Sequence, residues 1–328
     1  QSCHIRKLPK FSAKKKHGYE SPITVQKSDY WKEYTESYYQ MDTYYRLFHL
    51  SFQKSLETSN ILLDDLFKHV VDKVEGLYTH WFLGELGNNW SDVCADEMAT
   101  YGKVLEVPQQ EEFYRSRIKT SDTKIFVIIS DAMRYEVAAA MADQLQRETQ
   151  SKVSISSMQS VFPSITKFGM AALLPHKELT VEVRNDILTV LADGQSTAST
   201  YRDKVLKSED PASVALKYND IIAMKRAERS VLVKGMDVVY IYHDTIDEAS
   251  HTSDTAVFSA SRCSRLTILR SVFNCSCCNF KACCDFVPIP VFCTCFRTSL
   301  YPFPIANSFG GKDYKRMRRM VAGTVLLT

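Results

Sequence analysis

The sequence predicts an α/β protein built on a parallel sheet, with an α-helical region ahead of the sheet. Apolar residues recur three and four positions apart in the first part of the chain, which is the spacing of one helix face. Two short, continuous apolar runs, residues 125–130 and 238–242, are typical of strands buried on both faces of a parallel sheet. Helical patterns alternate with such runs, and this alternation indicates the α/β class.

The helical region is predicted from residue 27 to about 120, after a basic lead-in of residues 1–26 that we expect to be disordered. A first helix begins near Ser28, and a second begins near Asn60, which is a suitable N-cap. We expect residues 87–89, Gly-Asn-Asn, to end the second helix. The aromatic residues on these helices indicate either a packed helical core or a surface that stacks on a ligand.

The α/β region is predicted over residues 121–262. Its expected elements are a strand at 125–130, a helix at 132–149, a strand within 153–161, a helix at 165–174, a short strand around 181–183, a helix at 201–206 and a strand at 238–242. Ligand-binding and catalytic groups in such sheets lie beyond the carboxyl ends of the strands, so we expect the site residues at those positions.

Composition excludes several function classes. The 328 residues include 41 Lys and Arg against 38 Asp and Glu, so the net charge of +3 neither indicates nor excludes nucleic acid. The nucleotide-binding motifs G-x-G-x-x-G and G-x-x-x-x-G-K-[ST] and the nucleophile elbow G-x-S-x-G do not occur. The longest nearly apolar run, residues 286–296, is too short for a membrane helix. The amino terminus has neither a signal-peptide core nor an initiator Met, so we expect a cytoplasmic protein and a chain that is a fragment.

Asp131 is the first candidate site residue. It directly follows the predicted strand 125–130, where a carboxylate is well placed to hold a metal ion. The alternative is a structural one, because Asp is also a favoured N-cap for the helix expected at residue 132.

Thr166 is the second candidate, within the segment Phe-Pro-Ser-Ile-Thr at 162–166. A hydroxyl near the start of a helix lies in a field that favours anions and stabilises an alkoxide. Threonine is a weak nucleophile at its own pKa and needs activation, for example by a metal ion. Ser164 competes for this role, and either residue is equally suited to cap the helix.

Asp247 and His251 form the third candidate, just after the predicted strand 238–242. Residues four apart share a helix face, and a carboxylate with an imidazole is a reasonable half-site for zinc or manganese. His243 and Asp244 lie nearby in the sequence. The alternatives are a surface Asp–His pair or a cap.

Taken in order, these features resemble the alkaline-phosphatase superfamily, and more closely the PglZ domain of bacterial BREX phage-defence systems, type A. The segments IFVIISDAMRYEVA, ITKFGMAALLPH and VYIYHDTIDEA carry the resemblance, and MDTYYRLFHL, LYTHWFLGELGNNW and QQEEFYR resemble the region that precedes the domain. The resemblance covers about residues 28–258. It implies a partial alkaline-phosphatase-like core and other BREX proteins as partners.

The resemblance also implies a chemistry, a metal-dependent phosphoester hydrolase or transferase. Two divalent ions, zinc or manganese, would be held in the intact family; here Asp131, Asp247 and His251 would be ligands and Thr166 the nucleophile. Arg134 and Lys167 flank the site and are weak candidates for substrate contacts, with surface salt bridges as the alternative.

The sequence departs from the superfamily pattern in its later part. The superfamily completes its site with an Asp-His-Gly motif and one further His, whereas no His follows His251 in this chain. PglZ members also often carry an acid where His251 stands. We therefore expect an incomplete metal site and low activity, and the alternative is a non-catalytic scaffold subunit of a defence complex.

Residues 263–328 differ in composition from the rest of the chain. They hold eight of the ten cysteines and two acids against nine Lys and Arg. Three interpretations remain: a zinc-binding segment, a disulfide-bonded segment, and a non-native or disordered tail produced by a frameshift that replaced the native sequence. The abrupt change near residue 260 favours the third.

Overall fold

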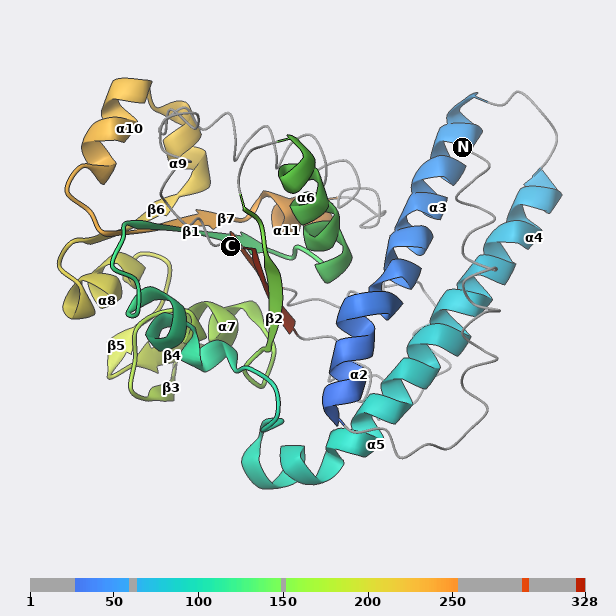
Figure 1. Ribbon diagram of the computed structural model, residues 1–328, viewed down its shortest axis with the longest axis horizontal. Coiled ribbons are helices and arrows are strands. Elements are labelled where there is room, and N and C mark those ends of the chain that lie inside the picture. Colours follow the sequence, from blue (N-terminus) through green and yellow to red (C-terminus); the bar gives the residue numbers. More distant parts are fainter. Residues whose placement is uncertain (1–26, 59–63, 149–151, 253–290, 295–322, 328) are drawn as a thin grey trace. The chain divides into compact units, whose positions relative to one another are not determined.

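The computed structural model describes residues 27–58, 64–148, 152–252, 291–294 and 323–327. The chain divides into two compact units, and each is described by itself. The described part of the first unit is helical and ends at residue 106. The second unit begins at Val107 and contains the sheets (Figure 1). The predicted lead-in of residues 1–26 lies outside the described residues.

Two long helices make up the described helical unit. The first comprises α2 (Lys27–Glu33), a π-helical turn (Tyr34–Tyr38) and α3 (Tyr39–Thr58), and the second comprises α4 (Asp64–Glu75), a π-helical stretch (Gly76–Leu83) and α5 (Gly84–Tyr101). The core between them contains Tyr38, Met41, Tyr45, Phe48, Val74, Tyr78, Phe82 and Leu86. The aromatic residues therefore pack inside this unit, as the first of the two interpretations predicts.

The expected helix break at residues 87–89 is wrong. Helix α5 runs through these residues to Tyr101 and ends at Gly102, whose φ of 68° is the left-handed conformation of a glycine C-cap. Leu86 and Gly87 are buried, so packing outweighs the weak helix propensity of the Gly-Asn-Asn sequence.

Polar groups are buried in the same helical core. The rings of Tyr45 and Tyr78 stack with their centroids 3.7 Å apart. The Tyr45 hydroxyl donates to Glu75 at 2.8 Å, and the Tyr78 hydroxyl donates to Asp42 at 2.6 Å. The hydrogen bond from Tyr78 offsets the cost of burying the Asp42 carboxylate, whereas Glu75 is only partly buried.

The second unit is an α/β unit with two sheets. In chain order its elements are a 3-10 turn (Gln110–Glu112), a π-helical turn (Tyr114–Ile118), β1 (Ile125–Asp131), α6 (Tyr135–Glu148), β2 (Ile155–Gln159), α7 (Thr166–Ala172), β3 (Leu179–Arg184), β4 (Ile187–Ala192), β5 (Gln195–Ser196), α8 (Arg202–Glu209), β6 (Ser213–Lys217), α9 (Tyr218–Ala223), α10 (Arg226–Val233), β7 (Val238–His243) and α11 (Thr245–Thr252). This arrangement confirms the predicted α/β class.

The larger sheet has the strand order β2-β9-β8-β1-β7-β6. Strands β1, β7 and β6 are parallel, and β8 (Val291–Thr294) pairs parallel to β1. Strand β9 (Gly323–Leu327) is antiparallel to both β8 and β2, so β2 runs in the same direction as β1. The carboxyl ends of β1, β2, β6 and β7 therefore meet at one edge of this sheet.

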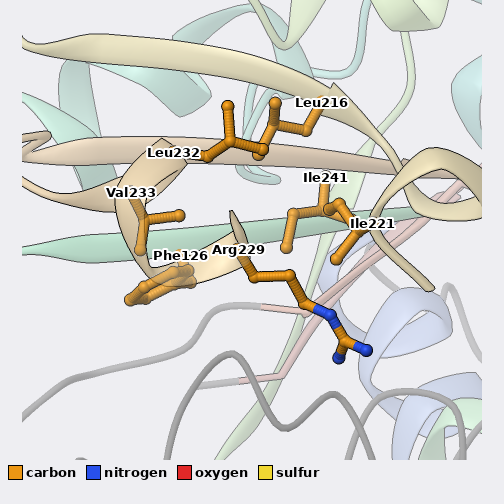
Figure 2. Close-up of a pocket in the computed structure, with 7 residues that line it drawn as sticks. All are labelled: Phe126, Leu216, Ile221, Arg229, Leu232, Val233 and Ile241. Atoms are coloured by element: carbon orange, nitrogen blue, oxygen red, sulfur yellow. The ribbon is translucent and has the colours of Figure 1, made fainter. Parts of the chain in front are cut away.

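Helices cover both faces of the larger sheet (Figure 1). Alternate residues of β1 and β7, such as Phe126 and Ile241, pack on one face against α6, α9 and Ile246 of α11. A small apolar hollow on this face is lined by Phe126, Leu216, Ile221, Arg229, Leu232, Val233 and Ile241 (Figure 2). It has room for about one water molecule, so it is no substrate site.

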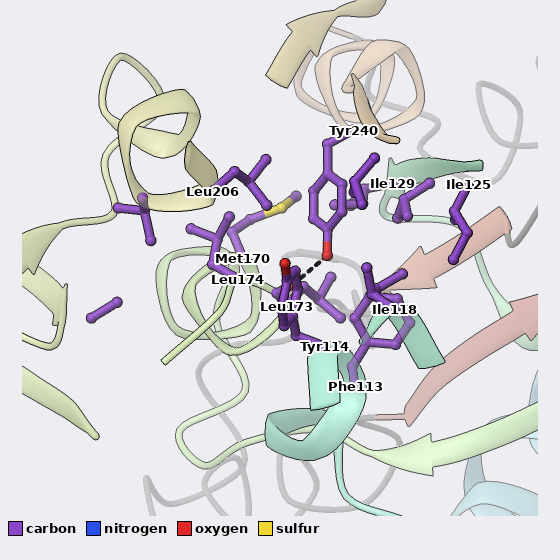
Figure 3. Packing of buried hydrophobic residues seen from close by; sticks show 14 of the residues in the cluster. Phe113, Tyr114, Ile118, Ile125, Ile129, Met170, Leu173, Leu174, Leu206 and Tyr240 are labelled. Carbon is purple, nitrogen blue, oxygen red and sulfur yellow. Dashed lines mark hydrogen bonds between the residues drawn. The ribbon is translucent and has the colours of Figure 1, made fainter. Parts of the chain in front are cut away.

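The opposite face of the sheet packs against α7, α8 and the turn at 114–118. Figure 3 shows its core, in which residues from β1 and β7 meet Met170, Leu173 and Leu206. Tyr240 is fully buried there, and its hydroxyl donates to the carbonyl of Leu173 at 2.8 Å. This bond joins β7 to the carboxyl end of α7.

Several elements were not predicted from the sequence. Strand β6 and helices α9 and α10 were missed. The short strand expected around residues 181–183 is β3, but its antiparallel sheet with β4 and β5 was not predicted. The turn between β3 and β4 holds Asn185 and Asp186, both at positive φ, which is the hairpin geometry that such residues favour. The Asn-Asp pair is a sequence signal from which this hairpin could have been predicted.

Most of residues 263–328 lies outside the described residues. Two short segments of it, β8 and β9, pair with the larger sheet. The origin predicted for this tail stays a prediction. Among the described helices, none is both long and apolar enough to cross a membrane.

Candidate functional site

Asp131 is the last residue of β1 and lies buried at the carboxyl edge of the larger sheet. Its Oδ1 accepts a hydrogen bond of 2.9 Å from the amide of Ala132, whose φ of 59° is unusual for a residue other than glycine. Helix α6 begins only at Tyr135, so Asp131 is not its N-cap. The helix start expected at residue 132 is wrong, because the chain makes a left-handed turn there first.

The side chain of Asp131 points to a face of the sheet that follows from the alternation of side chains along β1. Val127 and Ile129 pack on the face covered by α7 and α8, whereas Phe126 and Ile128 pack on the other face. Because side chains alternate along a strand, Asp131 projects toward the α7 side.

Thr166 is the first residue of α7, a few positions beyond the carboxyl end of β2. The N-cap is Ile165, which makes no side-chain capping bond, so the capping interpretation fails for both Ser164 and Thr166. Neither hydroxyl has a hydrogen-bond partner among the described residues, and both side chains are partly exposed. The peptide bond between Phe162 and Pro163 is cis.

Asp247 and His251 both belong to α11, which follows β7 and contacts β1. Asp247 lies in the first turn of this helix and is partly exposed. The side chain of His251 lies outside what the structure describes. The predicted pairing of Asp247 with His251 therefore stays a prediction.

The described residues meet the requirements of a divalent-metal site only in part. Asp131 and Asp247 follow neighbouring parallel strands and carry oxygen donors of the kind that such ions accept. Within the described ranges, however, no three His, Cys, Asp or Glu side chains come together as a metal-binding group. A complete ligand set is thus not formed by these residues alone.

The two cations predicted to contact substrate both have partners within the protein. The Nζ of Lys167 donates to the carbonyl of Leu188 on β4 at 3.2 Å. The Nε of Arg134 lies 3.5 Å from the buried carboxylate of Glu136. Arg134 thus has an ion-pair partner and Lys167 a backbone partner, and the substrate contacts of both stay a prediction.

Comparison with known proteins places the α/β unit in a family. The sequence profile described as "BREX system PglZ alkaline phosphatase-like domain" matches residues 112–273. The chain is 35% identical over 233 residues to the "Alkaline phosphatase-like protein BrxZ" of Escherichia coli O9:H4 (strain HS). It is 34% identical over 222 residues to the "Alkaline phosphatase-like protein PglZ" of Bacillus cereus (strain H3081.97). The chain belongs to the PglZ-domain family.

The aligned regions cover different shares of the proteins compared. They include 69% and 67% of this chain, but only 26% and 25% of the two relatives. The chain therefore spans about a quarter of the length of the curated relatives that it matches. The profile match includes Cys263 and stops before the seven cysteines that begin at Cys275.

The PglZ domain also contains a buried Ser–His contact that the sequence did not reveal. Ser130 and His243 are register partners on β1 and β7, and Ser130 Oγ lies 2.9 Å from His243 Nδ1. The ring of Tyr218 meets the imidazole edge-on, with centroids 4.8 Å apart. Burial lowers the pKa of His243, and the nearby carboxylate of Asp244 opposes this effect only in part.

A second unpredicted contact of the PglZ domain lies on the other face of β7. The guanidinium of Arg202 is 4.4 Å from the ring centroid of Tyr242, and its Nε donates to the carbonyl of Thr197 at 3.2 Å. No sequence motif marks this pair, because the contact depends on how α8 packs against β7.

Proposed function

We propose that this PglZ domain belongs to a metal-dependent phosphoester hydrolase or transferase of a bacterial anti-phage system. One observation carries the proposal. Asp131 ends β1 and projects toward α7, the helix that begins at Thr166, and the Thr166 hydroxyl is not used in capping. A carboxylate and an uncommitted hydroxyl at one edge of a parallel sheet suit nucleophilic attack on an ester.

Thr166 would be the attacking group: its oxygen bonds to phosphorus, its hydroxyl proton passes to solvent, and the ester P–O bond breaks to release the alcohol, which takes up a proton. Water or a second alcohol would then displace the Thr166 oxygen from phosphorus. Ser164 is the competing hydroxyl in the same turn. Asp131 and Asp247 would be metal ligands, with His251 as a further ligand from α11. A bound divalent ion would lower the pKa of the attacking hydroxyl and neutralise charge on the phosphoryl oxygens. The ions in question are zinc or manganese.

We further propose that the activity of this chain is low. The described residues supply only part of a ligand set, and no His follows His251 to complete it. Removing ligands from a metal site weakens both metal affinity and the electrostatic stabilisation of the transition state.

We also propose that residues 263–328 are translated from a shifted reading frame and replace the native continuation of the chain. The change in cysteine content and charge near residue 260 supports it. Translating the parent DNA in the other frames after Ala260 tests it. A strand followed by Asp-His-Gly in another frame is the expected result, and its absence from every frame contradicts the proposal.

The family description names the BREX system, which supports other BREX proteins as partners. We propose the cytoplasm as the location. The function is tested in cells that depend on this protein for defence, with Thr166→Ala and Asp131→Ala. We expect phage resistance to be lost while co-purification of the partner subunits is kept. Full resistance in both variants would contradict the enzyme and support the alternative, a non-catalytic scaffold subunit.

A further inference from the structure

Arg202, the first residue of α8, holds its guanidinium group in a fixed position. The group lies over the ring of Tyr242 at 4.4 Å, and its Nε donates to the carbonyl of Thr197 at 3.2 Å. These two contacts use one face of the guanidinium and one of its donors. Within the part of the chain that the structure describes, its two terminal nitrogens have no acceptor. They are therefore available to bind an anion.

Tyr242 supplies a second donor at the same place. The residue as a whole is partly buried, and its hydroxyl oxygen is buried without a hydrogen-bond partner among the described residues. A buried hydroxyl without a partner is costly, and most buried polar groups in native proteins have a partner in the protein, in water or in a bound group. Tyr240, two positions earlier on the same face, donates to Leu173 instead. The two tyrosines thus differ in a way that packing does not explain.

The register of the sheet places this pair beside the candidate site. Tyr242 is the register partner of Ile129, and Asp131 is the next residue of β1 that points to the same face. Helix α7, which begins at Thr166, packs on that face as well. Arg202 and Tyr242 therefore lie on the same face as the proposed nucleophile and metal ligand.

We propose that Arg202 and the Tyr242 hydroxyl bind the anionic oxygens of the substrate, a phosphate ester. The planar guanidinium fork matches two oxygens of a phosphoryl group, and stacking on the ring holds the fork in one plane. The phenol donates a further hydrogen bond to the same anion. The identification of the anion as a phosphate ester rests on the proposed function, whereas the binding of an oxyanion rests on this geometry alone.

Binding of inorganic phosphate to the purified full chain, followed by ³¹P NMR titration, tests the inference. We expect Arg202→Gln to weaken phosphate binding about tenfold, because it removes charge-assisted hydrogen bonds. Tyr242→Phe should weaken it by a smaller factor without lowering the stability of the fold. Arg229→Gln is the matched control, since this guanidinium donates through its Nε to Met224 at the hollow on the opposite face. Unchanged phosphate affinity in Arg202→Gln, or an equal loss in Arg229→Gln, would overturn the inference.

A measurement on the unmutated chain avoids any failure of a variant to fold. Phenylglyoxal modifies accessible arginines, and peptide mass spectrometry reports each site separately. We expect phosphate to slow modification of Arg202 and to leave that of Arg229 unchanged. Equal rates at Arg202 with and without phosphate would show that the arginine serves only to brace Thr197 and Tyr242.

The outcomes also separate this inference from the proposed function. Hydrolysis that depends on Thr166, combined with phosphate binding that does not depend on Arg202, overturns the inference and keeps the function. Phosphate binding that requires Arg202, without hydrolysis that requires Thr166, keeps the inference and contradicts the function.

Discussion

Two tyrosines on β7 give a matched pair of substitutions with opposite expected effects on stability. Tyr240 is fully buried, and its hydroxyl donates to the carbonyl of Leu173 at 2.8 Å. Tyr242 points to the same face, but its buried hydroxyl has no partner in the described structure. Replacing each by Phe removes one oxygen atom and leaves the packing of the ring unchanged.

The expected change in the free energy of unfolding follows from the polar group that each substitution removes and the partner that it leaves. Tyr240→Phe leaves the Leu173 carbonyl buried without its hydrogen bond, which costs about 1–3 kcal/mol. The melting temperature should then fall by about 2–4 °C for each kcal/mol, as is typical of a domain of 150–250 residues. Tyr242→Phe removes a buried polar group that gains nothing from the protein, so the free energy of unfolding should be unchanged or slightly higher.

Urea denaturation followed by circular dichroism in phosphate-free buffer measures the free energy of unfolding of both variants. The free energy of unfolding should fall with urea concentration at the same slope in both variants, because they expose the same surface on unfolding. Equal losses of stability in the two variants would refute the reasoning, since Tyr242 would then have a partner of its own. No loss in Tyr240→Phe would refute the bond between β7 and α7.

Four further predictions concern buried polar groups. Ser130→Ala should cost about 1–2 kcal/mol, since it removes the partner of the His243 imidazole. Burial lowers the pKa of the His243 imidazole, so the unfolded chain takes up the proton first as the pH falls. The stability that His243 contributes is therefore present above about pH 6.5 and is lost below it. Unfolding curves taken between pH 5 and about 8 should show a flatter pH dependence of stability in His243→Gln. In the helical unit, Tyr78→Phe should cost about 1–3 kcal/mol in urea denaturation, because the buried carboxylate of Asp42 loses a 2.6 Å hydrogen bond. Burial raises the pKa of Tyr114 to about 12, so the stability it contributes is present below pH 10 and is lost as the pH rises toward 12. The part of the tyrosinate absorbance that Tyr114→Phe removes should therefore appear together with alkaline unfolding, and its appearance well before unfolding would contradict this.

Local sequence patterns predicted the central strands and the residues at their ends. The runs at 125–130 and 238–242 are almost wholly apolar because both faces of these strands are covered by helices. Asp131 could be found because a strand's end is visible in the sequence. Thr166 could be found because the Pro-containing turn marks the start of the following helix.

Contacts that depend on register and packing could not be read in the same way. Ser130 and His243 are more than 100 positions apart, and they meet only because β1 and β7 pair in one register. Arg202 meets Tyr242 only because α8 covers the sheet at that point. The break expected at residues 87–89 failed for a related reason, since burial of Leu86 and Gly87 overrides local propensity.

The central claim, that Thr166 is the nucleophile of a phosphoester hydrolase, is tested most directly by one rate comparison. The measurement is the initial rate of aryl phosphodiester hydrolysis by the purified chain and its Thr166→Ala variant, each with added zinc or manganese. The account predicts slow hydrolysis by the unmutated chain and a fall to the uncatalysed rate in the variant. Equal rates for the two proteins would contradict it.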